Sequence, residues 1–367
     1  MNPRSRLAPL LPPLLALATA FALCAVAILA IGRSPAAAAA ALAEGAFDGP
    51  MALGETALKA TALVLTGLAV ALPYRAGLFN IGGQGQFLVG AIAAAWAGRT
   101  LGLPAPIELP SVLLFAAACG AAWGALAGVL KARRGVHEVI STILLNWIAL
   151  HLIDSWLVAG PLHASGASGF SHGGTEAVRA AARLPLLLPE GRLSLGLPLA
   201  LAAALLAWWI LARTPFGLEL RAIGASEPTA RAVGIPVPRR LVQAMALGGA
   251  FAALAGAAMI LGGGTDYRYP ENYRDPYGFD GIAIALVGAG HPLGVVLAAG
   301  LFGALRAGAI GLQDPTVGLH RSWPDILEGV AVVLIAGQRL FVVSGPGRRS
   351  QPPSAPGEDL PEAGGGR

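Results

Sequence analysis

The sequence is poor in charged residues, and this scarcity indicates the class of protein. Of its 367 residues, 12% are Asp, Glu, Lys or Arg and 55% are hydrophobic, and the mean hydropathy is +0.66. Soluble domains carry about 25% charged residues. Because long stretches hold almost no charge, the chain is predicted to be a polytopic membrane protein without a soluble domain of useful size.

Cysteines and catalytic motifs are scarce as well. Only Cys24 and Cys119 occur, far apart in apolar runs, which favours two buried small side chains over a disulfide or a metal site. The glycine-rich GGQG at residues 82–85 is not a Walker loop, because no Gly-Lys-Ser/Thr follows it. His137-Glu138 begins like a zinc-protease motif, but a serine stands where the second histidine is required. We therefore expect no metal site and no ATP site on this chain, and a membrane-embedded enzyme is disfavoured.

Apolar segments, in contrast, are abundant. A hydrocarbon core of about 30 Å takes about 20 helical residues to cross. The prediction is an all-α bundle of about ten transmembrane helices, of which the glycine-rich segments match the pattern least well. The ten segments are 7–31, 55–73, 86–103, 110–130, 136–158, 195–212, 241–262, 278–290, 293–310 and 324–343.

The first apolar run has two readings. An alanine-rich stretch at 36–43 resembles the cleavage region of a signal peptide, but the run before it is long for a signal core, which favours an uncleaved span.

Arginines are in excess on the side of the N-terminus, most clearly in short loops, so both chain ends are predicted to be cytoplasmic. The net charge of +5 therefore reflects inner loops and tails, and no nucleic acid is expected. Residues 1–343 form the predicted membrane domain, and the Pro- and Gly-rich residues 344–367 are predicted to be a disordered cytoplasmic tail.

The predicted inner loop at 213–240 is long and structured. Residues 216–223 suit a short helix, and Gly224 suits its left-handed C-cap. Ser226 suits the N-cap of a second helix, and Gly234 suits its end. Because a connector of about 28 residues with its own helices is longer than a turn needs, we expect this loop to dock a partner protein. Its expected apolar contacts are Leu218, Leu220, Ile223, Val233 and Ile235.

Four segments carry a resemblance to a known family. They are GLFNIGGQGQFLVGA, RRGVHEVISTILLNWIA, TPFGLELRAIGASEPTARAVGI and GFDGIAIALVGAGHPLGVVLAAGLFGAL, in this order. The chain resembles the membrane permeases of bacterial ABC importers for nucleosides and simple sugars, which are related to ribose and branched-chain amino acid permeases. The resemblance covers about residues 55–340.

The resemblance implies the partners and the location of the chain. A separate ATP-binding cassette ATPase would bind ATP and dock on the inner loop, so that this chain carries no cofactor. A second permease chain, either a homologue or a copy, and an extracytoplasmic substrate-binding protein would complete the importer in the bacterial cytoplasmic membrane. The docking segment carries over to Glu219, Arg221, Gly224, Ala230, Gly234 and Ile235.

Polar residues within or beside the spans form the candidate substrate path. Neutral amides donate and accept hydrogen bonds without the cost of a charge, which suits a polyhydroxy or base-bearing solute. The alternative is that these residues tie helices together, and Asp280 either caps a short helix or lines the path. The candidates are Asn80, Gln84, Gln86, Glu138, Ser141, Asn146 and Asp280. Two positions depart from the family pattern: Gly83-Gln84 stands where Ala-Glu is more frequent, and His137 where Asn is common.

The competing class is an ion-coupled secondary transporter of a small polar solute. Such a transporter needs intramembrane acids or interrupted helices in two corresponding halves. Glu138 and Asp280 are the main acids available, and no half-repeat is evident. The segment HEVISTILLNW favours the nucleoside branch of the resemblance, and a simple sugar stays open.

Overall fold

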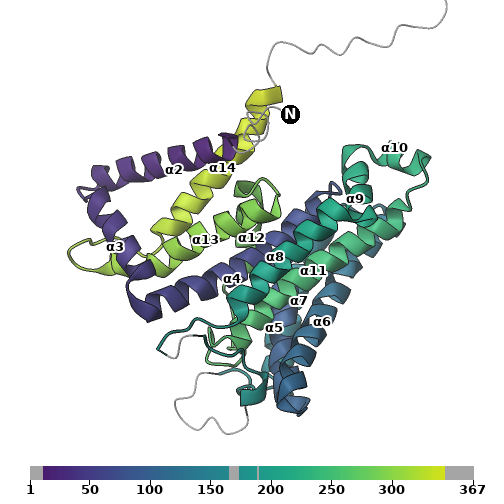
Figure 1. The fold of residues 1–367 in the computed structure, drawn as a ribbon, viewed down its shortest axis with the longest axis horizontal. Helices are drawn as coiled ribbons and strands as arrows, with labels where there is room; N and C mark the ends of the chain where they lie inside the picture. Colours follow the sequence, from purple (N-terminus) through teal and green to yellow (C-terminus); the bar gives the residue numbers. More distant parts are fainter. Residues whose placement is uncertain (1–10, 165–172, 188–189, 344–367) are drawn as a thin grey trace, which may run out of the picture.

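The computed structural model describes residues 11–164, 173–187 and 190–343, and these residues form a helical bundle (Figure 1). Within those ranges the only β-structure is a pair of isolated bridges. The helices are α2 (Leu11–Ala30), α3 (Pro35–Phe47), α4 (Gly49–Tyr74), α5 (Gly83–Thr100), α6 (Ala105–Arg134), α7 (Glu138–His151) with its π-helical extension η1 (Leu152–Val158), α8 (Gly196–Arg213), α9 (Pro215–Ala225), α10 (Glu227–Ala232), α11 (Val237–Leu261), α12 (Tyr277–Val287), α13 (Pro292–Gly308) and α14 (Trp323–Val343).

The centre of the bundle is built from α4 and α11. Both are buried along most of their length, and both pack against α5, while α11 also packs against α6 and α4 against α12 and α13. In the described part of the chain, seven helices are long and apolar enough to cross a membrane. The chain is therefore a helical, polytopic membrane protein.

Three of the expected spans lie outside that group of seven. α12 has 11 residues, which is short for a membrane span. α5 begins with the polar sequence GQGQ, and α14 carries Asp325, Glu328 and Arg339. The predicted count of ten spans rests on these three helices. The predicted tail at 344–367 lies outside the described residues.

The alanine-rich stretch at 36–43 belongs to a helix. Ser34 caps α3 by accepting a hydrogen bond from the Ala37 N–H at 3.3 Å, and Pro35 occupies the first turn. Alanine has the highest helix propensity, so this composition continues the helix readily. α3 packs against α13.

Glycines bring α6 and α11 into backbone contact. A Cβ atom on Gly120 would lie 2.5 Å from the Gly249 carbonyl oxygen, and one on Gly124 would lie 2.4 Å from that of Met245. Small residues at such crossings allow helices to approach closely inside a membrane. The contact fixes the wall of the bundle beside α5.

The two ends of the bundle differ in structure (Figure 1). α9 and α10 protrude at one end, and the segments 173–187 and 262–276 lie at the opposite end. These two segments are joined by backbone hydrogen bonds from Thr175 N to Tyr269 O at 2.9 Å and from Val178 N to Tyr267 O at 2.8 Å. The bundle therefore carries a helical projection at one end and a paired loop cover at the other.

Candidate functional site

The loop between α8 and α11 folds into the two short helices that the sequence predicts. Thr214 caps α9 by accepting a hydrogen bond from Gly217 N at 3.2 Å, and Ser226 caps α10 by accepting from Thr229 N at 3.4 Å. Gly234 ends this pair with a φ of +84°, a left-handed conformation that favours glycine. We call residues 213–240 the coupling loop.

The expected role of Gly224 as a left-handed cap is wrong. Gly224 lies inside α9, and it is not among the residues with positive φ. A Cβ atom at this position would lie 2.3 Å from the Arg75 carbonyl oxygen and 3.3 Å from Gly77 N. The glycine is required because the backbone of α9 lies against the turn that follows α4.

Charged residues attach the coupling loop to the bundle. Glu219 forms an ion pair with Arg240 at the start of α11, and the Arg240 guanidinium lies 5.5 Å from the centre of the Phe216 ring. Arg221 donates a hydrogen bond to the Leu211 carbonyl of α8. These contacts hold α9 on both neighbouring helices, so displacement of α9 displaces its surroundings.

The coupling loop also has a small apolar core and an exposed apolar edge. Leu220, Ile223 and Ala230 are buried, and Ile235 is half-buried. Leu218 and Val233 are 61% and 71% exposed, so they lie on the surface of the loop. These two side chains form an exposed apolar edge at the projecting end of the bundle.

Asn80 and Gln86 bind each other. The Asn80 Nδ2 donates to Gln86 Oε1 at 2.9 Å and to the Ala69 carbonyl of α4 at 3.1 Å. The Gln86 Nε2 donates back to Asn80 Oδ1 at 3.2 Å. Both side chains are buried, so in this conformation they connect the segment before α5 to α4.

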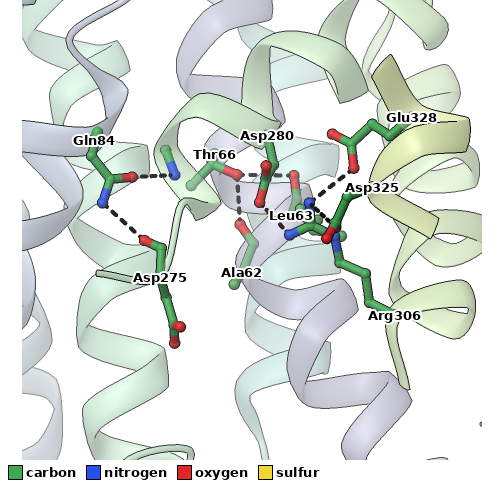
Figure 2. A network of polar contacts seen from close by, with 10 residues as sticks. Ala62, Leu63, Thr66, Gln84, Asp275, Asp280, Arg306, Asp325 and Glu328 are labelled. Carbon is green, nitrogen blue, oxygen red and sulfur yellow. Dashed lines mark hydrogen bonds and ion pairs between the residues drawn. The ribbon is translucent and has the colours of Figure 1, made fainter. Parts of the chain in front are cut away.

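Gln84 and Asn146 connect α5 to two other elements. Gln84 donates to the Asp275 carbonyl at 2.8 Å and accepts from Gly278 N at 2.9 Å, which joins α5 to the start of α12 (Figure 2). Asn146 of α7 accepts from Gly85 N at 2.8 Å and donates to the Ile81 carbonyl at 2.9 Å. α5 is thereby fixed between α7 and α12.

A small recess lies where these three helices meet. It has a volume of about 110 Å³ and a largely apolar lining, in which Gln84 and Asn146 lie beside two aromatic side chains. Trp147 is 58% and Phe279 46% exposed, whereas Phe87 is fully buried and packs against Tyr273 and Tyr277. The lining residues are Gln84, Leu88, Ile143, Asn146, Trp147, Leu150 and Phe279.

The two acidic candidates lie elsewhere. Glu138 stands at the first turn of α7 and pairs with Lys131 of α6 at 2.9 Å, and Ser141 donates to the Glu138 backbone carbonyl at 3.1 Å. Asp280 of α12 pairs with Arg306 of α13. Neither acid lines the recess, so the structure brings together only Gln84 and Asn146 there.

Arg306 is the centre of an ionic cluster that sequence reasoning missed. Its Nη2 lies 3.0 Å from Glu328 Oε2 and 3.4 Å from Asp325 Oδ1 of α14, in addition to the contact with Asp280 (Figure 2). The signal in the sequence is an arginine inside an apolar run, because such a residue requires partners within the membrane. Among the described residues no group of three His, Cys, Asp or Glu side chains is arranged to hold a metal ion.

A larger cavity opens at the end opposite the coupling loop. It has a volume of about 640 Å³, and the loop from Gly264 to Asp275 forms most of its wall. Asp266, Tyr267 and Asn272 adopt positive φ in this loop, a conformation that is uncommon outside glycine. The wall ends at Asp275, whose carbonyl Gln84 holds, so Gln84 lies between the cavity wall and the recess.

Residues 52–336 match the family described as the permease component of the branched-chain amino acid transport system. The chain belongs to this permease family. The permease is 40% identical to the guanosine ABC transporter permease protein NupP of Bacillus subtilis (strain 168), over 90% of this chain and 94% of NupP. It is 32% identical to the glucose ABC transporter permease protein TsgB13 of Haloferax volcanii, over 90% and 87% of the two chains. It is 30% identical to the nucleoside ABC transporter permease protein NupB of Lactococcus lactis subsp. cremoris, over 91% of each chain.

Proposed function

We propose that this chain is one permease subunit of a bacterial ABC importer and forms part of the path by which a nucleoside crosses the membrane. The observation that carries this proposal is the 40% identity to a guanosine permease over nearly the full length of both chains. A simple sugar is the second candidate, favoured by the 32% identity to a glucose permease.

The residues that line the recess favour a neutral solute that carries a base. Gln84 and Asn146 each retain one amide N–H beyond the hydrogen bonds described above, and amides make directional bonds without charge. Trp147 and Phe279 add exposed aromatic surface, on which a planar base can stack. We assign the path to this recess and the outer cavity, and the other polar candidates to the connections that shape it.

Three further subunits complete the importer in this proposal. The ATPase binds ATP and docks on the coupling loop, where Leu218 and Val233 are exposed. A binding protein delivers solute to the outer cavity. The second permease is a homologue, a view favoured by a second guanosine permease of Bacillus subtilis, NupQ, which is 26% identical to this chain.

The proposed topology has ten spans in the bacterial cytoplasmic membrane, with residues 1–343 as the permease domain and 344–367 as a cytoplasmic tail. In support, each of the ten expected segments overlaps one α-helix, and α12 is the shortest of these ten helices. The beginning of α2 and the end of α14 lie toward the same side as α9 and α10 in Figure 1. This arrangement is what an even number of spans with both ends inside requires.

Reconstituted transport tests the function. The permease, its ATPase and the second permease are placed in proteoliposomes with the binding protein outside, and uptake of labelled guanosine, uridine, ribose and glucose is measured. We expect ATP-dependent uptake of a nucleoside that persists when ionophores abolish all ion gradients. Uptake that requires an ion gradient and does not depend on ATP would support the secondary transporter instead. Uptake of glucose or ribose without uptake of a nucleoside would show that the solute is a sugar.

A further inference from the structure

One arginine lies between the coupling loop and the far end of α12. Arg75 follows α4 directly, and its carbonyl oxygen would lie 2.3 Å from a Cβ atom on Gly224 of α9. The next glycine of the same turn, Gly77, also meets Gly224. The backbone of α9 therefore rests on the backbone of the turn that carries Arg75.

The side chain of Arg75 reaches a different element. Its Nη2 donates to the Gly290 carbonyl oxygen at 2.7 Å, across 215 residues of sequence. Ala289 and Gly290 have φ values of +52° and +62° and form the turn between α12 and α13. Because a guanidinium stays charged in proteins, this hydrogen bond is of the stronger, charge-assisted kind.

Arg75 lies close to a second arginine, Arg221 of the coupling loop. The side chain is half-buried, and burial lowers the pKa of its guanidinium, with a further decrease from the nearby positive charge of Arg221 in α9. Arg221 in turn is bonded to α8. The coupling loop thus contacts the turn of Arg75 through backbone packing, and its Arg221 lies close enough for charge repulsion to act on the Arg75 guanidinium.

α12 joins this corner to the recess. The helix has 11 residues, which corresponds to a length of about 16 Å. Its C-terminal end is followed by the turn that contains Gly290. At its N-terminal end, Gly278 N donates a hydrogen bond to Gln84. Since Phe279 lines the recess, a displacement applied at Gly290 moves a wall of the recess.

We propose that Arg75 is a positioning residue for transport, which transmits the displacement of α9 to α12 and so to the recess. The proposal rests on the proposed function, because a docked ATPase supplies the displacement of α9. The turn after α4 receives the displacement of α9 through backbone contact. The hydrogen bond from Arg75 to the Gly290 carbonyl then transmits this displacement to α12.

The test compares Arg75→Gln and Arg75→Lys with the wild type in the assembled complex. Spin labels at Ile140→Cys of α7 and Phe279→Cys of α12, used for this readout alone because Phe279 lines the recess, report the distance between the two helices with and without ATP. A second readout is the number of solute molecules imported per ATP hydrolysed. Arg134→Gln is the matched control, because Arg134 is an exposed arginine at the end of α6.

We expect Arg75→Gln to assemble and hydrolyse ATP, to lose the ATP-driven change in distance, and to import about tenfold less solute per ATP. Arg75→Lys keeps a single ammonium donor on a shorter side chain, so its change in distance and its import per ATP should lie between those of Arg75→Gln and the wild type. Arg134→Gln should match the wild type in both quantities. A normal change in distance in Arg75→Gln overturns the proposal, as does an equal loss of hydrolysis and uptake, which marks a purely structural role.

Two further outcomes are separated by the same design. If Arg75→Gln does not insert, Arg75→Lys decides: a reduced change in distance supports the connection, and a wild-type change overturns it. If the wild-type complex shows the ATP-driven change but imports neither nucleosides nor sugars, the proposed substrate is wrong and the role of Arg75 is still decided by the labels.

Discussion

Asp280 of α12 and Arg306 of α13 form an ion pair inside the bundle, and Arg306 also reaches two carboxylates of α14. Three helices of the C-terminal half are therefore held by one guanidinium. Because one buried cation neutralises several acids, loss of Arg306 should destabilise the cluster more than loss of any one of the acids.

Arg306→Leu is expected to destabilise the permease strongly. Removal of the guanidinium leaves Asp280 and Glu328 buried without a counter-charge, which costs about 3–5 kcal/mol. Asp280→Asn should cost less, because Arg306 keeps its two partners on α14. Thermal unfolding in detergent, followed by size-exclusion chromatography, measures both variants against Arg321→Leu, an exposed arginine in the turn before α14. Equal midpoints for Arg306→Leu and Arg321→Leu would contradict the expectation.

Gly224→Val should abolish transport while the permease still inserts. Its side chain would have to occupy the space of the Arg75 carbonyl oxygen, so α9 must move away from the turn after α4. Gly300→Ala in α13 is the control, because a Cβ atom there meets nothing within 4 Å. The measurement is substrate-stimulated ATP hydrolysis together with uptake. Normal coupling in purified Gly224→Val complex would refute the need for this contact.

Substitution of Gln84 tests the connection between α5 and α12. Gln84→Leu loses both hydrogen bonds and leaves Gly278 N unpaired, a cost of about 1–3 kcal/mol, and uptake should fall accordingly. Gln84→Glu keeps the acceptor for Gly278 N but places a carboxylate oxygen against the Asp275 carbonyl. Its uptake should therefore rise as the pH falls, because a protonated carboxyl donates again, while wild-type uptake changes less. A pH profile of Gln84→Glu parallel to the wild type would argue against the donated bond.

The exposed apolar edge of the coupling loop, formed by Leu218 and Val233, is expected to bind the ATPase. Leu218→Asp and Val233→Asp should each weaken ATPase binding by about tenfold or more, since a charge replaces apolar surface in the contact. Glu227→Gln removes a charge from the exposed Glu227–Arg231 pair of the same loop and should change binding little. Co-purification at graded salt or titration of the purified ATPase measures the affinities. Unchanged binding in both aspartate variants would place the docking surface elsewhere.

Local features of the fold were predictable from the sequence. Apolar length predicts the positions of the helices, and Ser226 and Gly234 predict the two ends of the second helix of the coupling loop, because caps are set by neighbouring residues. Gly224 was assigned the wrong role for a physical reason. A glycine that ends a helix and a glycine that permits backbone contact look alike in sequence, and only the position of Arg75 separates them.

Contacts between distant segments were not predictable in the same way. Gln84 meets a backbone group 194 residues further along the chain, and Arg306 meets acids 22 and 26 residues away on other helices. The sequence identified Gln84 and Asp280 as unusual but left open whether they face solute or protein, and Arg306 was not recognised from the sequence. Which amide lines a recess depends on helix rotation, which the packing of glycines against backbone determines.

The shortness of α12 has a consequence for the permeability barrier. Its 11 residues correspond to about 16 Å, roughly half of a hydrocarbon core of about 30 Å, and the loop that precedes it lines the larger cavity. In the proposed topology of ten spans, the insulating layer between the two aqueous compartments is therefore thin at this place. A transporter built this way needs to open and reseal only a short section, so that small helix displacements can move a solute while ions and water are kept from leaking through.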